Sequence, residues 1–142
     1  MASVRDLLDA KGTAIYSVGP DDPVLDAIKT MAQRHVGALL VMKGGELLGI
    51  VSERDYARKV ILLGRSSSDT KVSQIMSTPV YTISLKRSVE DCMRLMTEHR
   101  VRHLPVVESG RVVGVISIGD LVKAVIEDQR HTIEQLEDYI HR

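Results

Sequence analysis

Two short stretches of the sequence combine residue types that could bind a phosphorylated sugar. They are GIVSERD at residues 49–55 and GVISIGD at residues 114–120, and each places a serine three residues before an aspartate. If a helix begins just after each serine, its free N–H groups and partial positive charge suit a phosphate. The serine hydroxyl can donate to that phosphate, and an aspartate one turn later can accept from ribose hydroxyls, as in dinucleotide sites.

The same spacing also fits a helix cap with no ligand at all. Ser-x-x-Asp after an apolar run is a capping-box signal, in which serine and aspartate satisfy each other's backbone N–H groups. Gly49 and Gly114 are harder to explain by capping, because glycine inside a strand lowers stability and often marks a close approach of backbone or ligand. The sequence therefore leaves two interpretations of each motif: a helix cap, or half of a ligand site.

The chain is written twice, and the duplication includes both motifs. Residues 16–55 align with residues 81–120 without a gap, at an offset of 65. The glycine, serine and aspartate of the two motifs are identical, whereas the two positions between serine and aspartate differ. Upstream, VRDLL at residues 4–8 is the likely counterpart of VSQIM at residues 72–76, and the first repeat has three extra residues after this segment. An internal repeat of this extent indicates two copies of one structural unit.

Each repeat predicts the order β-α-β-β-α, a mixed α/β (α+β) fold. Asp22 and Pro23 predict the start of the first helix, with proline at the first helical position. Gly44-Gly45 and Ser109-Gly110 predict hairpin turns. The last stretch predicts one long helix or two broken ones. The predicted strands are residues 15–18, 37–42 and 46–52, and residues 80–83, 102–108 and 111–117.

Composition excludes several classes of function. The 19 basic and 19 acidic residues cancel, which argues against broad nucleic-acid binding. Cys92 is the single cysteine, so no disulfide framework or cysteine metal cluster is expected. The N-terminus lacks the apolar core of a signal peptide, and no run reaches membrane-spanning length, so we expect a cytoplasmic protein without a membrane partner. No nucleophile, metal set or catalytic base stands out, so we expect no enzyme.

The duplicated unit resembles a cystathionine-β-synthase (CBS) domain pair, also called a Bateman module. The resemblance rests on Gly-apolar-apolar-Ser-x-x-Asp in both repeats and on VRHLPVV in the second, and it covers about residues 4–127. It implies two sheets packed around a pseudo-two-fold axis, and a stand-alone bacterial protein. The expected divisions are repeat 1 at 1–64, a linker at 65–71, repeat 2 at 72–128 and a C-terminal helix at 129–142.

The resemblance further implies two clefts that bind adenosine ligands, each built from both repeats. One cleft would use Ser52, Asp55, Thr78, Val80, Val101 and His103, with phosphate charge met by Arg54, Arg58 and Arg65. The other would use Ser117, Asp120, Thr13, Ile15, Val36 and Ala38, with Arg102 for phosphate.

The repeats differ at positions that bear on these clefts. Gly37 stands opposite Arg102, Ala38 opposite His103, and Leu40 opposite Pro105, so the basic groups are not symmetric and equal occupancy is in doubt. The expected ligand is AMP, ADP, ATP or NAD(H), with no metal required. A homodimer is expected, together with a regulated protein that the sequence does not name. A ligand-free interaction module and a nucleotide-processing enzyme are the alternatives.

Overall fold

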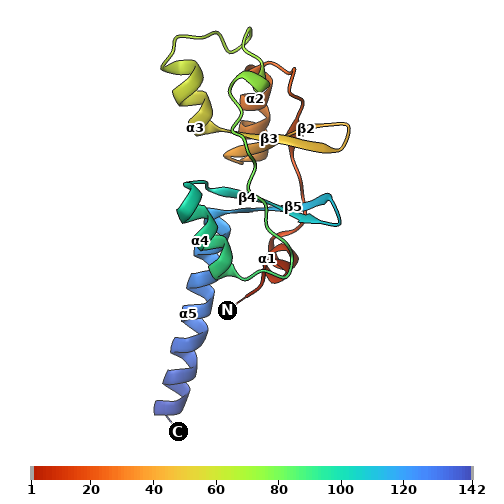
Figure 1. Cartoon of the computed structure of the whole chain (residues 1–142). Coiled ribbons are helices and arrows are strands. Elements are labelled where there is room, and N and C mark those ends of the chain that lie inside the picture. The colour runs from red at the N-terminus through yellow and green to blue at the C-terminus, as the bar shows by residue number, and fades with distance from the viewer. Residues whose placement is uncertain (1, 142) are drawn as a thin grey trace. The chain divides into compact units, whose positions relative to one another are not determined.

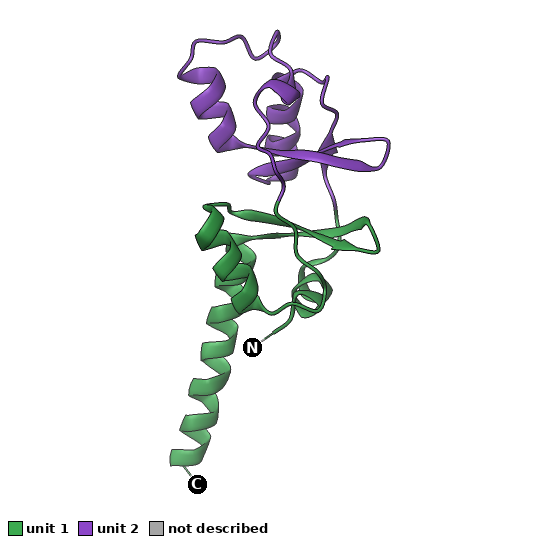
Figure 2. Ribbon diagram, in the orientation of Figure 1, with its two compact units in different colours: residues 1–14, 81–142 green, residues 15–80 purple. Residues whose placement is uncertain are grey.

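The computed structural model describes residues 2–141, and these form two compact units (Figures 1 and 2). Unit 1 takes residues 1–14 and 81–142, and unit 2 takes residues 15–80. Each unit therefore contains the segment that leads into the other repeat. The predicted repeat boundaries follow the duplication in the sequence and stay a prediction. The two units instead group the residues that pack together.

Unit 2 is built on a three-stranded sheet in the order β1-β2-β3. β1 pairs with β2 in parallel, and β2 pairs with β3 in antiparallel fashion. Its core is formed by Val24, Met31, Leu39, Val51 and Ile75, among others. Its elements are β1 (Ser17–Val18), α2 (Val24–Arg34), β2 (Ala38–Lys43), β3 (Glu46–Ser52), α3 (Glu53–Tyr56), a π-helical turn η1 (Ala57–Ile61) and a 3-10 turn η2 (Val72–Gln74).

Unit 1 contains a two-stranded antiparallel sheet of β4 and β5. The helix α1 inserts Val4, Leu7 and Leu8 into the same core as Leu104 and Ile116. Its backbone is tied to this unit, because Val4 N donates to Arg87 O over 2.8 Å. The elements are α1 (Val4–Lys11), α4 (Val89–His99), β4 (His103–Glu108), β5 (Arg111–Ser117) and α5 (Ile118–Ile140).

Both predicted hairpins are confirmed by the strand pairing of β2 with β3 and of β4 with β5. The turn residues Gly44 and Gly45 have φ of 58° and 81°, and Ser109 and Gly110 have φ of 50° and 75°. Positive φ at both central residues is the requirement of a type I′ turn, whose twist matches the flanking strands.

The predicted strand at residues 80–83 is wrong, since only Ile83 bridges to Val106 there. The physical reason lies in the facing strand. In unit 2, Leu40 N donates to Tyr16 O over 3.1 Å and helps hold the first strand against β2. Pro105 occupies the matching place in β4 and has no N–H to donate to Tyr81, so the ladder is interrupted.

The start of α2 also differs from the prediction. The helix begins at Val24, Pro23 is its N-cap residue, and Asp22 instead accepts from Gly19 N over 2.8 Å. The segment predicted as a linker supplies the missing acceptors, because Val24 N donates to Thr70 O and Leu25 N to Ser67 O. Thr70 is accordingly buried, so this segment is part of the packing of unit 2.

Candidate functional site

The serine and aspartate of each motif form a reciprocal helix cap. At the start of α5, Ser117 N donates to Asp120 Oδ2 over 2.8 Å, and Asp120 N donates to Ser117 Oγ over 3.2 Å. Ser52 and Asp55 make the same pair of bonds before α3. The capping alternative is therefore correct as a description of both motifs.

Capping boxes of the same spacing also begin α1 and α4, at Ser3 with Asp6 and at Ser88 with Asp91. The spacing alone thus does not mark a ligand site. The two motifs differ from the cap of α4 in the cation that pairs with the aspartate. Asp55 and Asp120 are each paired with a lysine, whereas Asp91 is paired with arginines.

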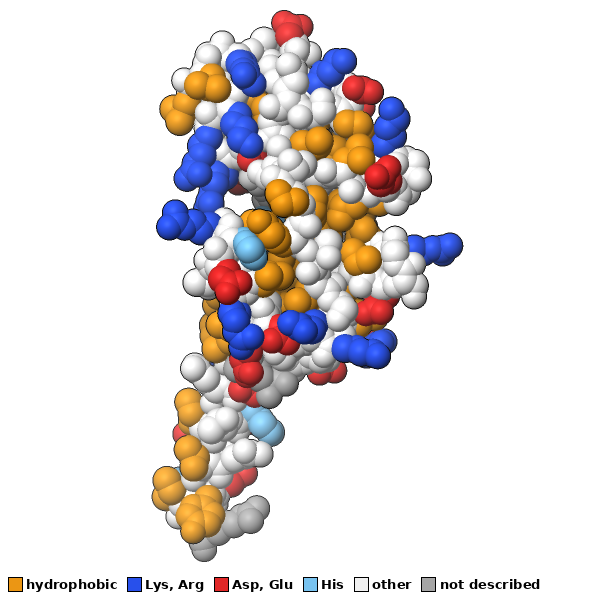
Figure 3. Space-filling model, in the orientation of Figure 1, with side chains coloured by type: hydrophobic (Ala, Val, Ile, Leu, Met, Phe, Trp, Pro, Cys, Tyr) orange, Lys and Arg blue, Asp and Glu red, His pale blue; other side chains and the backbone are white. Residues whose placement is uncertain are grey.

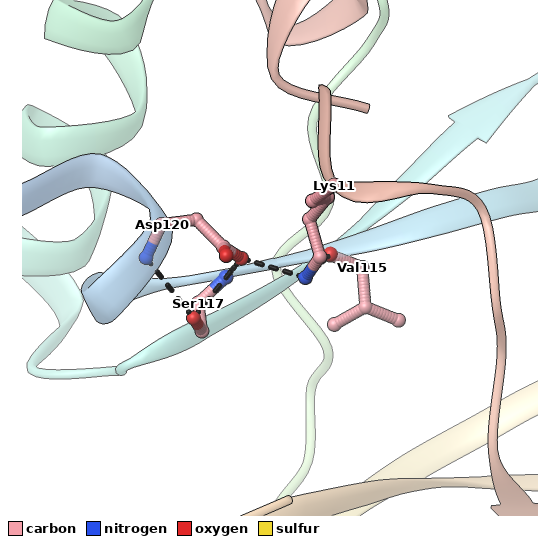
Figure 4. A network of polar contacts seen from close by, with 4 residues as sticks. All are labelled: Lys11, Val115, Ser117 and Asp120. Carbon is pink, nitrogen blue, oxygen red and sulfur yellow. Dashed lines mark hydrogen bonds and ion pairs between the residues drawn. The ribbon is translucent and has the colours of Figure 1, made fainter. Parts of the chain in front are cut away.

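The Asp120 carboxylate lies beside the ammonium group of Lys11, at the end of α1 (Figure 4). Lys11 Nζ donates to Asp120 Oδ2 over 2.6 Å and to the backbone carbonyl of Val115 over 2.8 Å. Partial burial alone would raise the pKa of Asp120, but the hydrogen bonds from Lys11 and Ser117 outweigh it and lower the pKa. Asp120 is therefore an anion at neutral pH.

The contacts of Asp120 leave one carboxylate oxygen open. All its hydrogen bonds within residues 2–141 use Oδ2 or its own N–H, so none is made to Oδ1. Its side chain is 22% exposed. This half of the predicted site can accept a further hydrogen bond without losing one it already has.

Asp55 is more enclosed than its counterpart. Oδ2 accepts from Ser52, while Oδ1 accepts from Ser77 Oγ over 2.9 Å and lies 3.1 Å from Lys59 Nζ. Asp55 is only 7% exposed. Both of its oxygens are in use, so a ligand hydroxyl would have to displace Ser77 or Lys59.

Arg102, just before β4, and His103, its first residue, lie beside the start of α5 in unit 1. His103 lies opposite Ser117 in the sheet, and Arg102 O accepts from Ile118 N over 2.8 Å. Burial lowers the pKa of His103, and the positive charge of Lys11 adds to that shift. His103 is therefore a neutral imidazole at neutral pH. In unit 2, Ala38 occupies the matching position opposite Ser52.

The strand glycines are explained by close packing within each unit. A Cβ at Gly114 would lie 2.7 Å from Leu8 Cδ2, and a Cβ at Gly49 would lie 2.8 Å from Met76 Sδ and 3.2 Å from Ser77 O. The segments leading into the two repeats thus pack directly over these glycines. The close approach expected at both positions comes from the chain itself.

The predicted site residues as a whole are divided between the two units. Unit 1 holds Thr13, Val101, Arg102, His103, Ser117 and Asp120. Unit 2 holds Ile15, Val36, Gly37, Ala38, Ser52, Arg54, Asp55, Arg58, Arg65, Thr78 and Val80. Each predicted cleft takes residues from both units, so the grouping of residues into two clefts stays a prediction.

Sequence reasoning missed three residues at these aspartates: Lys11, Lys59 and Ser77. Lys59 was within reach of a sequence argument, since it follows Asp55 by four residues on a helical stretch. Lys11 carried no such signal, because it lies in the region where three extra residues interrupt the repeat.

Residues 2–141 contain no group of three or more His, Cys, Asp or Glu side chains that is arranged to hold a metal ion. Within the same range, no helix is both long enough and apolar enough to cross a membrane.

The comparisons with known proteins agree on the family. The model of the CBS domain matches residues 4–62 and 72–127. The mitochondrial CBS domain-containing protein CBSX3 of Arabidopsis thaliana is 46% identical over 147 residues, covering 97% of this chain and 71% of that protein. A solved protein with CBS domains from Burkholderia ambifaria is 53% identical, with a TM-score of 0.87 over 90% of this chain and 96% of the other.

A more distant structure shows the same fold. The CBS domain pair of protein MJ0100, in complex with 5′-methylthioadenosine and S-adenosyl-L-methionine, is 21% identical to this chain. Its TM-score is 0.80, over 90% of this chain and 98% of the other.

Proposed function

Because the chain belongs to the CBS domain family and carries a CBS pair, a regulatory module, we propose that it binds an adenosine ligand and catalyses no reaction. The observation that carries the proposal is the Asp120 carboxylate, which is held as an anion with Oδ1 open and with Lys11 beside it. Such a carboxylate suits the vicinal hydroxyls of a ribose. The adjacent ammonium group suits a phosphate on the same ligand.

The proposal places the ligand at Asp120 in preference to Asp55. Asp120 can accept a ribose hydroxyl through Oδ1 while keeping its cap, whereas Asp55 must give up a contact to Ser77 or Lys59. A buried acceptor that loses a partner costs about 1–3 kcal/mol unless the ligand replaces it. We therefore propose one ligand per chain, with AMP, ADP, ATP and NAD(H) as candidates.

Two findings support a ligand of this class without catalysis. The solved CBS pair of MJ0100 holds two adenosine compounds, one of which is S-adenosyl-L-methionine. Cys92, the single cysteine, is buried, and burial raises the pKa of its thiol to about 11, so it is a poor nucleophile. A nucleotide-processing enzyme with a thiol nucleophile is accordingly the weaker alternative.

The ligand-free interaction module is the stronger alternative, since the caps account for both serines and both aspartates. Thermal unfolding with AMP, ADP, ATP, NAD, NADH and S-adenosylmethionine separates the two. A ligand at about 100 times its dissociation constant stabilises the fold by roughly 2.7 kcal/mol. We expect one or more of these compounds to raise the melting temperature by several degrees.

Variants at three aspartates test the assignment. Asp120→Asn should abolish the ligand-induced shift and Asp55→Asn should leave it in place. Asp91→Asn is the matched control, because Asp91 closes the same kind of capping box at α4 and is paired with Arg87 and Arg94. A shift that survives Asp120→Asn would contradict the site, and no shift with any compound would favour the interaction module.

A further inference from the structure

Unit 2 exposes three consecutive apolar side chains at the end of the π-helical turn η1. Ile61, Leu62 and Leu63 are 57%, 76% and 61% exposed, whereas Val60 before them is fully buried. We call these three exposed residues the apolar tip. Apolar surface in water favours contact with another apolar phase. A contiguous exposed patch of this kind marks an interaction site more often than a scattered apolar residue does.

Backbone hydrogen bonds hold the apolar tip in place. Leu62 N donates to Ala57 O over 3.0 Å, and Arg65 N donates to Val60 O over 2.9 Å. Gly64, with a φ of 66°, turns the chain back at this point, a conformation that glycine adopts without strain. The three apolar side chains are therefore presented to solvent by an ordered turn.

The second repeat shows that the fold does not require this tip. At the offset of 65 residues, Leu62 and Leu63 correspond to Glu127 and Asp128. Both acidic residues are exposed on α5. Because the equivalent positions carry charge in the other repeat, packing within the unit does not explain the leucine pair.

Residues 56–68, which include the apolar tip, carry only positive charge. This stretch contains Arg58, Lys59 and Arg65 and no acidic residue. The equivalent residues 121–133 of the second repeat contain two basic and two acidic residues. The zero net charge of the whole chain therefore conceals a local excess of positive charge.

Two of these charges are open to a partner. Lys59 pairs with Asp55, with 3.1 Å between Nζ and Oδ1. Arg58 and Arg65 are exposed, and neither forms an ion pair within residues 2–141. In Figure 3, hydrophobic side chains lie beside Lys and Arg side chains at the upper left of unit 2. A partner of the apolar tip therefore meets two arginines that flank it in the sequence.

We propose that the apolar tip, together with Arg58 and Arg65, binds the surface of an anionic lipid bilayer. Apolar side chains enter the boundary between headgroups and acyl chains, while basic residues stay with the anionic headgroups. Each basic residue close to such a surface strengthens binding about fivefold. The expectation of no membrane partner rested on the absence of a spanning run, which a surface contact does not need. The proposal is independent of the ligand site.

The spacing of the apolar tip favours a lipid surface over a groove in a protein. A helix that fills a protein groove presents apolar residues at i, i+3, i+4 and i+7, along one face. The residues of the apolar tip are consecutive, so their side chains spread in several directions around the turn. A fluid bilayer boundary accepts all three without a shaped pocket.

Cosedimentation of the full chain with lipid vesicles tests the proposal. We expect binding to vesicles of equal parts phosphatidylglycerol and phosphatidylcholine, and much weaker binding to phosphatidylcholine alone. Leu62→Glu/Leu63→Asp, which copies the second repeat, should abolish binding and leave the unfolding midpoint unchanged, since both leucines are more than half exposed. A wild type that ignores the anionic vesicles, or a variant that still binds them, would overturn the proposal.

A matched control separates the apolar tip from net charge. Gln33→Glu/Gln74→Glu adds the same two negative charges at exposed residues elsewhere in unit 2 and should bind like the wild type. Loss of binding in this control as well would show attraction by net charge alone, against a role for the apolar tip. Arg58→Gln/Arg65→Gln should weaken binding about 25-fold, from fivefold for each charge. Unchanged binding in that variant would remove the two arginines from the site.

Insertion into the bilayer is tested by a polarity-sensitive fluorophore on an introduced cysteine. The label at Leu62→Cys should shift to the blue on anionic vesicles, whereas the same label at Gln33→Cys should not. Native Cys92 is buried and should not take the label. An unshifted label at position 62 would refute insertion. If the wild type ignores vesicles and Leu62→Glu/Leu63→Asp instead lowers the molar mass in solution, the apolar tip is a contact between copies and the proposal fails.

Discussion

Gly114→Ala tests whether the glycine of the second motif serves internal packing. A Cβ at this position would lie 2.7 and 2.8 Å from the two methyl carbons of Leu8 and 3.3 Å from its Cγ. Leu8 is 3% exposed and sits in the core of unit 1, so it has little room to move. The substitution therefore forces α1 away from β5, and Lys11 at the end of α1 moves with that helix.

The magnitude follows from these distances. Carbon atoms in contact rest about 3.5–4.0 Å apart, so the Leu8 methyl groups must retreat by roughly 1 Å. Overpacking of this kind costs about 1–3 kcal/mol. Removing a glycine from the unfolded chain offsets about 0.4–1 kcal/mol of that cost. We expect a net loss of about 1–2 kcal/mol.

Urea unfolding of the ligand-free protein measures this loss as a lower midpoint at constant slope. Gly119→Ala is the matched control, because among residues 2–141 its Cβ would meet only Ser117 Oγ, at 3.6 Å, and Gly119 is the second residue of α5. Alanine there meets no close contact and should not lower the midpoint. The packing argument is refuted if Gly114→Ala unfolds at the wild-type midpoint or above.

Three further predictions concern unit 1. Lys11→Met should lower stability by about 1 kcal/mol, as expected for a partly exposed charged pair. The folded-state pKa of Asp120 is lowered, so the stability from the Lys11–Asp120 pair is complete above the unfolded-state pKa of about 4. This stability is lost as the pH falls through the folded-state pKa. A stability difference between variant and wild type that stays constant across acid unfolding curves would contradict this prediction. NMR titration should give His103 a pKa below 6.5, and Lys11→Met should raise it, since burial and the Lys11 charge lower it; an unchanged value in the variant would exclude the Lys11 contribution. Cys92, with a thiol pKa of about 11, should react with a disulfide reagent only after unfolding, and rapid reaction of the native protein would count against its burial.

Much of the local structure could be predicted because it depends on neighbours in sequence. The type I′ turns at Gly44-Gly45 and Ser109-Gly110 and the caps of α3 and α5 follow from residues within one turn of each other. The absence of a strand at residues 80–83 was harder to predict, because its cause is Pro105 in β4. A proline's missing donor matters only once the facing backbone group is known.

The sequence by itself determined the duplication, the order of elements in the first repeat and the membership in the CBS family, since all three depend on residue types at fixed spacings. Only the tertiary structure decided that α1 packs over Gly114, that Lys11 reaches Asp120, and that Ser77 encloses Asp55. These contacts join segments that sequence periodicity does not connect. Lys11 and Asp120, for example, are 109 positions apart in the sequence. Two motifs with the same spacing therefore became one open carboxylate and one enclosed carboxylate, because the chain brings a different partner to each.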